Sequence, residues 1–214
     1  MSKFRFHLSV SADGYVAGPN QSENDPLGEG GEQLHDWVLP LAAWREPHGK
    51  EGGEVNASTP VVEELQANVG AGIMGRNMFG PPIGGDWGDE SWRGWWGEEP
   101  PFHHPVFVLT HHERKPLEME GGTTFTFVSD GIESALEQAR EATGGKDVQL
   151  HGGASVARQY LAAGLLDEFG ISIVPVLLGG GERLLDSVGP ELELEQVRAV
   201  EAPGVTHVKY RVVK

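Results

Sequence analysis

Large apolar and polar side chains alternate over residues 4–11, which is the period of a strand that buries one face. Asp13-Gly14 predicts a turn after it, and residues 15–17 resume an extended pattern. Beyond position 105, apolar runs of strand length alternate with segments of helical period. The pattern predicts strands at 106–109, 125–128, 148–150 and 169–176, and helices at 132–143, capped by Asp130, and at 155–163.

This order of elements favours one fold class. Strands that alternate with helices form a mostly parallel sheet with helices on both faces. The last two extended segments, near 192–200 and 205–213, predict an antiparallel C-terminal hairpin at one sheet edge. We therefore expect a three-layer αβα domain that spans residues 1–214 as one unit, because no repeat or shift in composition divides the chain.

The region before position 105 is less regular. Residues 33–44 carry apolar side chains at helical spacing, but Pro40 interrupts them, so we expect a kinked or short helix. Ser58, followed by threonine and proline, is typical of a helix start and predicts a helix over 58–69. A short apolar strand is expected next, at 71–74.

A long loop over residues 81–104 combines glycines and prolines with four of the six tryptophans. Long loops of this kind inside a compact domain are usually functional or interacting. The tryptophans predict either a lid that stacks on a flat aromatic substrate or a contact with another subunit.

Composition limits the classes of function. The chain has 32 acidic and 16 basic residues, a formal charge of −16, which argues against nucleic acid and anionic membranes as partners. It has no cysteine, which excludes disulfides, thiolate metal sites and a cysteine nucleophile. The apolar runs are far shorter than the ~20 residues of a membrane helix, and the first strand leaves no room for a leader peptide. We expect a cytoplasmic protein.

The first candidate site is the junction Gly75-Arg76, where a strand gives way to a helix. Backbone N–H groups at a helix start attract phosphate, and arginine adds a planar fork of donors. Taken alone, this junction fits the simpler alternative better, a surface arginine after a turn glycine.

The second candidate site is Gly152-Gly153, again between a strand and a helix. Two glycines let a ligand approach the backbone, and the following helix start presents its amides to a diphosphate. A tight turn is the alternative. Two such junctions at strand carboxyl ends nevertheless mark the edge where open α/β sheets bind ligands. The three-glycine dinucleotide fingerprint is missing, which disfavours an ordinary Rossmann domain.

The third candidate site, Thr110-His111-His112, follows a buried strand. A hydroxyl and imidazoles at a strand end suit a ribose phosphate. His103-His104 lies upstream and raises the alternative of a metal-dependent hydrolase. Adjacent histidines on a strand point to opposite faces, however, which is poor geometry for a metal, so we expect no metal site. Solvated loop histidines are the simpler alternative.

Asp36 is the candidate catalytic residue. It lies between His35 and Trp37, next to the apolar stripe of the predicted helix. Apolar neighbours raise the pKa of a carboxyl group and let it donate a proton near neutral pH. The alternative is an exposed helix acid.

Taken together, the motifs resemble the dihydrofolate reductase-like family, in the branch similar to the reductase domain of bacterial riboflavin biosynthesis. The matches follow the right order over nearly the whole chain. They are residues 11–18 (SADGYVAG), 75–78 (GRNM), 105–110 (PVFVLT), 152–156 (GGASV), 165–169 (LLDEF) and 175–181 (PVLLGGG).

The resemblance implies a reductase that transfers hydride from NADPH to a C=N or C=O bond of a small, often heterocyclic (pterin- or pyrimidine-like) substrate. Val16 and Ala17 match the segment that lines the nicotinamide. Asp36 is an approximate match to the acid that folate-reducing members carry after the first loop. We expect a homodimer. The alternative within the same fold is a member that binds a nucleotide or small ligand without catalysis.

The resemblance also assigns the phosphate contacts. Gly75 and Arg76 match the phosphate-contacting turn, and Thr110 with His111 matches the strand end that receives the adenosine 2′-phosphate.

The diglycine turn completes the implied cofactor site. Gly152, Gly153, Ser155 and Val156 match the turn that packs against the diphosphate. His151 is a departure, because the riboflavin-pathway reductases typically carry an acid at this position. Neither folate nor the riboflavin pyrimidine can therefore be assigned as substrate.

Overall fold

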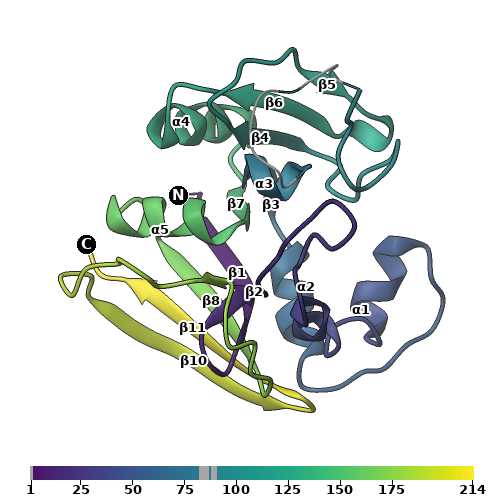
Figure 1. The fold of residues 1–214 in the computed structure, drawn as a ribbon, viewed down its shortest axis with the longest axis vertical. Coiled ribbons are helices and arrows are strands. Elements are labelled where there is room, and N and C mark those ends of the chain that lie inside the picture. Colours follow the sequence, from purple (N-terminus) through teal and green to yellow (C-terminus); the bar gives the residue numbers. More distant parts are fainter. Residues whose placement is uncertain (1, 82–86, 88–90) are drawn as a thin grey trace.

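The computed structural model describes residues 2–81, 87 and 91–214. Within these residues, nine strands form one sheet in the order β10-β11-β8-β1-β7-β3-β4-β6-β5, and β2 pairs with β9 in a separate small sheet (Figure 1). The strands are β1 (Phe4–Ser11), β2 (Tyr15–Ala17), β3 (Val69–Gly75), β4 (Pro105–Leu109), β5 (Leu117–Glu118), β6 (Thr124–Val128), β7 (Asp147–Gly152), β8 (Glu168–Val174), β9 (Glu182–Arg183), β10 (Leu194–Ala202) and β11 (Val205–Val212).

The pairing of the strands confirms the expected fold class. The central strands from β8 to β6 run parallel, whereas β10 and β11 form an antiparallel hairpin that pairs with β8. The short edge strand β5, which the pattern does not predict, is antiparallel to β6.

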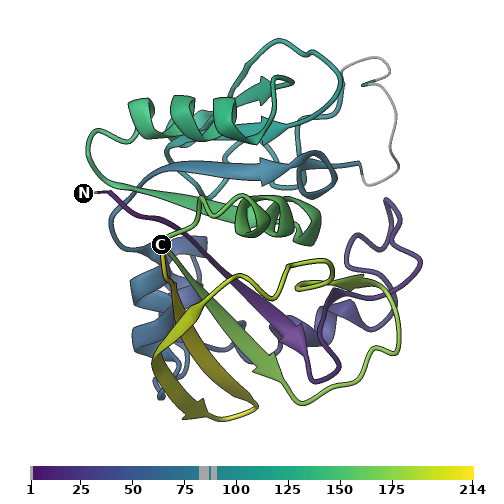
Figure 2. The same ribbon diagram turned by 90° about the vertical axis from the view of Figure 1, so that its left-hand side faces the viewer.

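Helices α4 (Ile132–Ala142) and α5 (Ala154–Ala162) cover one face of the sheet, and α1 (Ala42–Arg45) and α2 (Thr59–Gln66) lie on the other (Figures 1 and 2). On α4, Ala135, Leu136 and Ala139 share the buried face at helical spacing. They join the main core cluster with apolar side chains of β1, β3, β7 and α5. The remaining helical pieces are short: α3 (Arg76–Phe79), η1 (Gly31–His35), η2 (Glu46–His48) and η3 (Glu120–Gly122).

Two predicted helices differ from the structure. Over 33–44, η1 ends at His35 and α1 begins at Ala42, because Pro40 cannot continue the helix between them. The helix expected over 58–69 ends at Gln66, since the chain from residue 69 pairs with β7 instead.

Two predicted helix caps are also wrong. The residue before α4 is Gly131, with no side-chain cap, so Asp130 does not cap that helix. The Ser58 hydroxyl likewise makes no cap bond to α2; it is hydrogen-bonded to His207.

The tryptophan-rich segment supplies a second part of the core. Trp87, Trp92 and Trp96 belong to a cluster with Met74 and Phe79 on the face opposite α4 and α5. The indole nitrogen of Trp92 donates to the carbonyl oxygen of Phe79 at 2.9 Å. These rings cover the sheet of their own chain, with Trp92 and Trp96 only partly buried. The expected lid or subunit contact stays a prediction. Residues 82–86 and 88–90 of the predicted loop lie outside the described residues.

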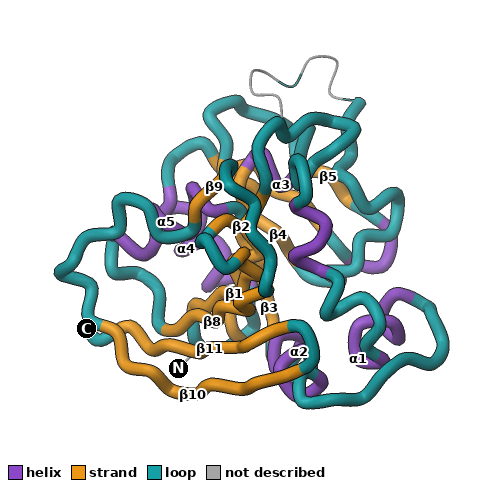
Figure 3. The backbone as a smooth tube through the Cα atoms, turned by 60° about the horizontal axis from the view of Figure 1, so that its bottom comes forward, coloured by secondary structure: helices purple, strands orange, loops and turns teal. Residues whose placement is uncertain are grey.

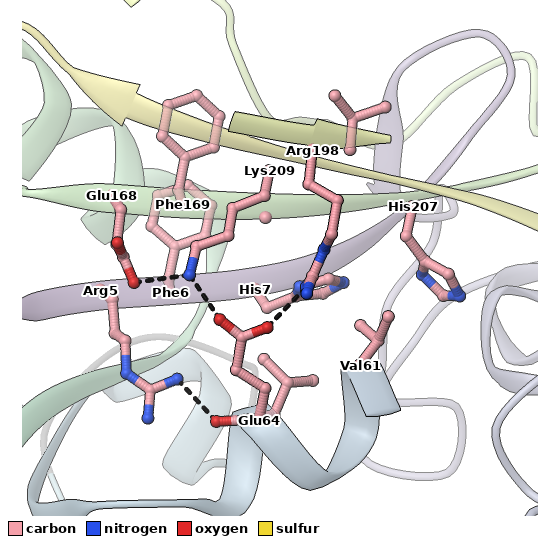
Figure 4. Close-up of a pocket in the computed structure, with 13 residues that line it drawn as sticks. Arg5, Phe6, His7, Val61, Glu64, Glu168, Phe169, Arg198, His207 and Lys209 are labelled. Atoms are coloured by element: carbon pink, nitrogen blue, oxygen red, sulfur yellow. Dashed lines mark hydrogen bonds and ion pairs between the residues drawn. The ribbon is translucent and has the colours of Figure 1, made fainter. Parts of the chain in front are cut away.

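Charged side chains hold the second half of α2 to the sheet (Figure 4). Glu64 accepts hydrogen bonds from Arg198 and Lys209, both at 2.5 Å, and Lys209 also pairs with Glu168 at 2.8 Å. From β1, Arg5 donates to the carbonyl oxygen of Glu64 at 3.1 Å. Burial acts to raise the pKa of Glu64, but the hydrogen bonds from Lys209 and Arg198 lower it to about 2.

A chain of hydrogen bonds ties the start of α2 to the same sheet face. Ser58 Oγ lies 2.9 Å from His207 Nε2, and His207 Nδ1 lies 2.8 Å from Ser172 Oγ. The Ser172 hydroxyl in turn lies 2.6 Å from His7 Nε2. A neutral imidazole offers one donor and one acceptor, so this chain is complete when both histidines are neutral. Burial lowers the pKa of His207 to about 4; burial and then the charge of His207 lower the pKa of His7 to about 3.

These two histidines predict an acid-sensitive stability. In the unfolded chain these histidines are protonated below about pH 6.5. In the folded chain His207 is protonated only below about pH 4 and His7 only below about pH 3. The contribution of these two histidines to the free energy of unfolding is therefore largest above about pH 6.5, and it decreases as the pH drops. For His207 the loss between pH 7.5 and 5 is up to about 2 kcal/mol.

Urea titrations at the two pH values measure this loss. The variant His207→Gln should lack the part of this loss that is due to His207. The control His48→Gln, which changes an exposed histidine, should show the same loss as the wild type. An equal loss in His207→Gln and the wild type would contradict the assignment.

Candidate functional site

The carboxyl ends of the parallel strands meet at one edge of the sheet, where the predicted site residues gather. Gly75, at the end of β3, pairs with Leu109 of β4, and Met74 pairs with Gly152 of β7. The three junctions predicted from the sequence therefore follow neighbouring strands in the order β7, β3, β4. This is the edge at which open α/β sheets bind ligands.

The turns after β3 and β7 approach each other without room for a side chain. A Cβ atom on Gly75 would lie 2.9 Å from Val156 Cγ2 and 3.7 Å from the Gly153 nitrogen. Gly152 has φ near +145°, a conformation that side chains disfavour, and its peptide bond to Gly153 is cis. The structure thus brings Gly75, Gly152, Gly153 and Val156 together.

The N-terminus of α5 opens beside this contact. Gly153 is its N-cap residue with no side-chain cap, and a Cβ built there would meet no atom within 4 Å among the described residues. Ser155 in the first turn is exposed, whereas Val156 is buried in the main core. A Cβ on Gly153 would therefore point into free space at the start of α5, while the core fixes the helix behind it.

Arg76 is placed by the segment that follows α3. Its guanidinium donates to the carbonyl oxygens of Gly80 and Pro81, at 2.7 and 2.9 Å, and lies 3.8 Å from the centre of the Trp87 ring. Burial, and then the nearby charge of Arg114, lower the pKa of Arg76. Two guanidinium groups thus lie near each other around one indole ring.

The turn after β4 is linked to Arg76 through the same ring. The indole nitrogen of Trp87 donates to the carbonyl oxygen of His112 at 2.8 Å. The Thr110 hydroxyl is buried and bonds within its own turn, accepting from the N–H of His112 at 3.1 Å. His111 is exposed. In this structure Thr110 shapes the turn, and the side chains of His111 and His112 are both exposed.

Val16 and Ala17 form β2, which pairs with β9. We call residues 176–183 the strap; it ends in β9, which lies beside β2 (Figure 3). A Cβ on Gly181 of the strap would overlap the carbonyl oxygen of Ala17. Val16 packs against the main core and Ala17 is buried. The segment predicted to line the nicotinamide is thus in close contact with Gly181 of the strap.

The environment predicted for Asp36 is wrong. Asp36 is the residue after η1, and it is exposed, whereas its neighbour Trp37 turns inward and donates to the Ser9 hydroxyl at 3.0 Å. Because Pro40 breaks the helix into short pieces, Asp36 does not face the apolar stripe. The apolar surroundings on which the prediction rested are therefore absent.

A histidine pair near the site was not predicted. The rings of His104 and His151 lie parallel, with centres 5.6 Å apart and 10° between their planes. Burial, and then the charge of His104, lower the pKa of His151 to about 3. A Cβ on Gly72 would overlap the His151 ring, so the imidazole fits there because residue 72 has no side chain. The sequence shows His151 before the diglycine, but the partnership with His104 depends on strand order.

The described residues lack two other features, a metal-binding cluster and a membrane-spanning helix. No group of three or more histidine, aspartate or glutamate side chains there could hold a metal ion. None of the helices in that part of the chain is long and apolar enough to cross a membrane.

Comparison with known proteins identifies the family. The model of the RibD C-terminal domain matches residues 3–208. The chain belongs to the RibD C-terminal domain family. Its mostly parallel sheet with the antiparallel hairpin is the dihydrofolate reductase-like fold of that family.

Individual relatives of this RibD C-terminal domain protein are distant. The uncharacterized protein YyaP of Bacillus subtilis (strain 168) is 30% identical over 118 residues, 53% of this chain and 62% of that protein. The structure of a putative riboflavin biosynthesis protein from Shewanella sp. PV-4 has 20% identity and a TM-score of 0.62, with 99% of both chains covered.

A third relative is longer than this chain. It is the diaminohydroxyphosphoribosylaminopyrimidine deaminase/5-amino-6-(5-phosphoribosylamino)uracil reductase of Thermotoga maritima, with 13% identity and a TM-score of 0.55. The match covers 99% of this chain and 57% of that one. At these identities the two solved structures show the fold.

The contact between the two glycine turns can be tested by a double-mutant cycle. Gly75→Ala should lower the free energy of unfolding by about 1–3 kcal/mol, because the new methyl group overlaps Val156. In the Val156→Ala background the same change should cost less, with a coupling of at least about 0.5 kcal/mol in urea titrations. Strict additivity would show that the two turns do not touch.

Proposed function

We propose that this protein is an NADPH-dependent reductase that transfers hydride to a C=N or C=O bond of a small, pterin- or pyrimidine-like substrate. One observation carries the proposal: two glycine turns meet at the carboxyl edge of the sheet beside the open N-terminus of α5. Membership of the RibD C-terminal domain family supports the same activity.

The residues present fit the cofactor. Open space beside Gly153 and the first amides of α5 suit a diphosphate, which accepts hydrogen bonds and carries negative charge. Arg76 and Arg114 give local positive charge within an acidic chain. The exposed His111 lies in the turn that Trp87 links to Arg76 and would serve the adenosine 2′-phosphate.

When bound, NADPH supplies the hydride, and the protein binds and orients the reactants. Backbone groups of Val16 and Ala17 hold the nicotinamide, and Gly152 and Gly153 leave space for the diphosphate. The side of the sheet with Trp37 and Ser9 forms the wall of the substrate site. In our proposal Asp36, which precedes Trp37 in the chain, passes a proton from water to the substrate.

A ligand-binding protein without catalysis is the alternative within the same fold. The exposure of Asp36 favours it, because water rather than a closed pocket surrounds this carboxylate. Both functions predict that NADPH binds, so the binding experiment tests them together. Only the reductase predicts that NADPH is oxidised, so an activity assay separates them.

Titration with NADPH should quench the tryptophan fluorescence, since Arg76 contacts the ring of Trp87 near the proposed phosphate site. Isothermal calorimetry gives an independent affinity. Lack of binding at millimolar NADPH by both methods would contradict both functions.

Variants of Arg76 separate its charge from its contacts with the chain. If the charge contributes to the 2′-phosphate, Arg76→Ala should weaken NADPH about tenfold more than NADH, and Arg76→Lys should keep most of the preference. If the arginine only holds Gly80 and Pro81, both variants should weaken NADPH and NADH equally. Calorimetric Kd values for the two cofactors decide between these outcomes.

A substrate panel of pterins, pyrimidines and small carbonyl compounds tests catalysis through NADPH oxidation at 340 nm. With an active substrate, Asp36→Asn should lower kcat at least about tenfold and leave the NADPH affinity unchanged. The control Glu32→Gln alters an exposed acid of η1 and should change neither. An unchanged kcat in Asp36→Asn would remove Asp36 from the reaction.

A further inference from the structure

Asp13 lies in the turn between β1 and β2, and its carboxylate binds the strap. It accepts hydrogen bonds from the backbone N–H groups of Leu178, at 3.1 Å, and Gly179, at 2.8 Å. The Ser11 hydroxyl first, and then these two amides, lower the pKa of Asp13 to about 2. The carboxylate is therefore charged at any pH where the protein works, and each of its oxygens holds one strap amide.

The strap joins the two sides of the proposed site. At one end Gly181 presses against the carbonyl oxygen of Ala17, and β9 follows at once. At the other end Leu178 packs in the cluster that contains Leu34 of η1, and a Cβ on Gly30 would lie 3.2 Å from its side chain. The strap thus touches both the segment assigned to the nicotinamide and the helix that precedes Trp37.

We propose that Asp13 is a positioning residue for the nicotinamide half of the cofactor. By holding Leu178 and Gly179 it fixes the strap, and through Gly181 the strap fixes the backbone of Ala17. This inference rests on the proposed function, because Ala17 is assigned there to the nicotinamide. Charge-assisted hydrogen bonds to two consecutive amides make a stronger clamp than neutral bonds would.

The clamp holds the stretch of the strap that lies between its two hydrogen-bonded ends. Residues 182–183 are held by strand pairing with β2, and Val176 accepts a hydrogen bond from the N–H of Ala12 at 2.9 Å. Between them, Gly179 has φ near +69° and Gly181 near +110°, so this stretch is built from residues with wide backbone freedom. Loss of the carboxylate would free the segment that faces Ala17.

The experiment compares two ligands that share the adenosine half. NADPH and adenosine 2′,5′-bisphosphate are titrated by calorimetry into the wild type, Asp13→Ala, Asp13→Asn and the control Asp186→Asn, an exposed acid just after the strap. Asp13→Ala should weaken NADPH about tenfold and change the bisphosphate less than about twofold. Asp13→Asn should lie between, because one amide oxygen still accepts, and Asp186→Asn should match the wild type.

Hydrogen exchange of the ligand-free proteins provides a readout that does not depend on the cofactor. Asp13→Ala should speed exchange at residues 177–181 and at Ala17, and leave α4 unchanged. Equal weakening of both ligands, or unchanged exchange in the strap, would overturn the role of Asp13. Normal NADPH binding by Asp13→Ala would overturn it while leaving the proposed function intact. A wild type that binds neither ligand would overturn the proposed function, and the inference with it.

Discussion

Close approach between backbone segments is the constraint on which this structure depends. At Gly75 a single Cβ would reach Val156, and at Gly181 it would overlap the carbonyl oxygen of Ala17. Both contacts lie next to a strand end, and both are possible because the glycine has no side chain of its own. A site made from such contacts presents backbone amides and carbonyls, which is the chemistry that a dinucleotide needs. The need for these contacts accounts for part of the 31 glycines in the chain.

The two faces of the sheet are built differently. Toward α4 and α5 the packing is apolar and continuous, and it fixes Val156 and with it the start of α5. Toward α2 the same strands present ion pairs and a hydrogen-bonded row that includes His7 and His207. The proposed cofactor contacts are therefore anchored on the apolar side, whereas the proposed substrate wall at Trp37 touches the polar row through the ring of His207.

Local signals were enough to predict most of the fold and part of the site. Alternation over 4–11 and the helical periods after 105 follow from contacts close in sequence, so the parallel sheet, the hairpin and the junction at Gly75 could be predicted. What failed depended on contacts distant in sequence. The helix expected to reach residue 69 gives way to pairing with β7, and Ser58 binds His207 rather than capping α2. The surroundings of Asp36 were predicted wrongly because Pro40 interrupts the helix, and Trp37 rather than Asp36 faces the core. The resemblance assigned roles to Val16 and Ala17, but the strap that encloses them comes from about 160 positions later in the chain.

The polar layer against α2 also affects the charge of the solvent-exposed surface. Arg5 is buried in it and Lys209 nearly so, and Arg114 is buried among aromatic rings elsewhere. Basic side chains withdrawn in this way leave the outer shell more acidic than the ratio of 32 to 16 suggests. An anionic ligand must cross that repulsive field before it reaches the amides at the sheet edge. Its association should therefore become faster as ionic strength rises and the Debye length shrinks to about 8 Å at 0.15 M, the reverse of what a basic surface produces.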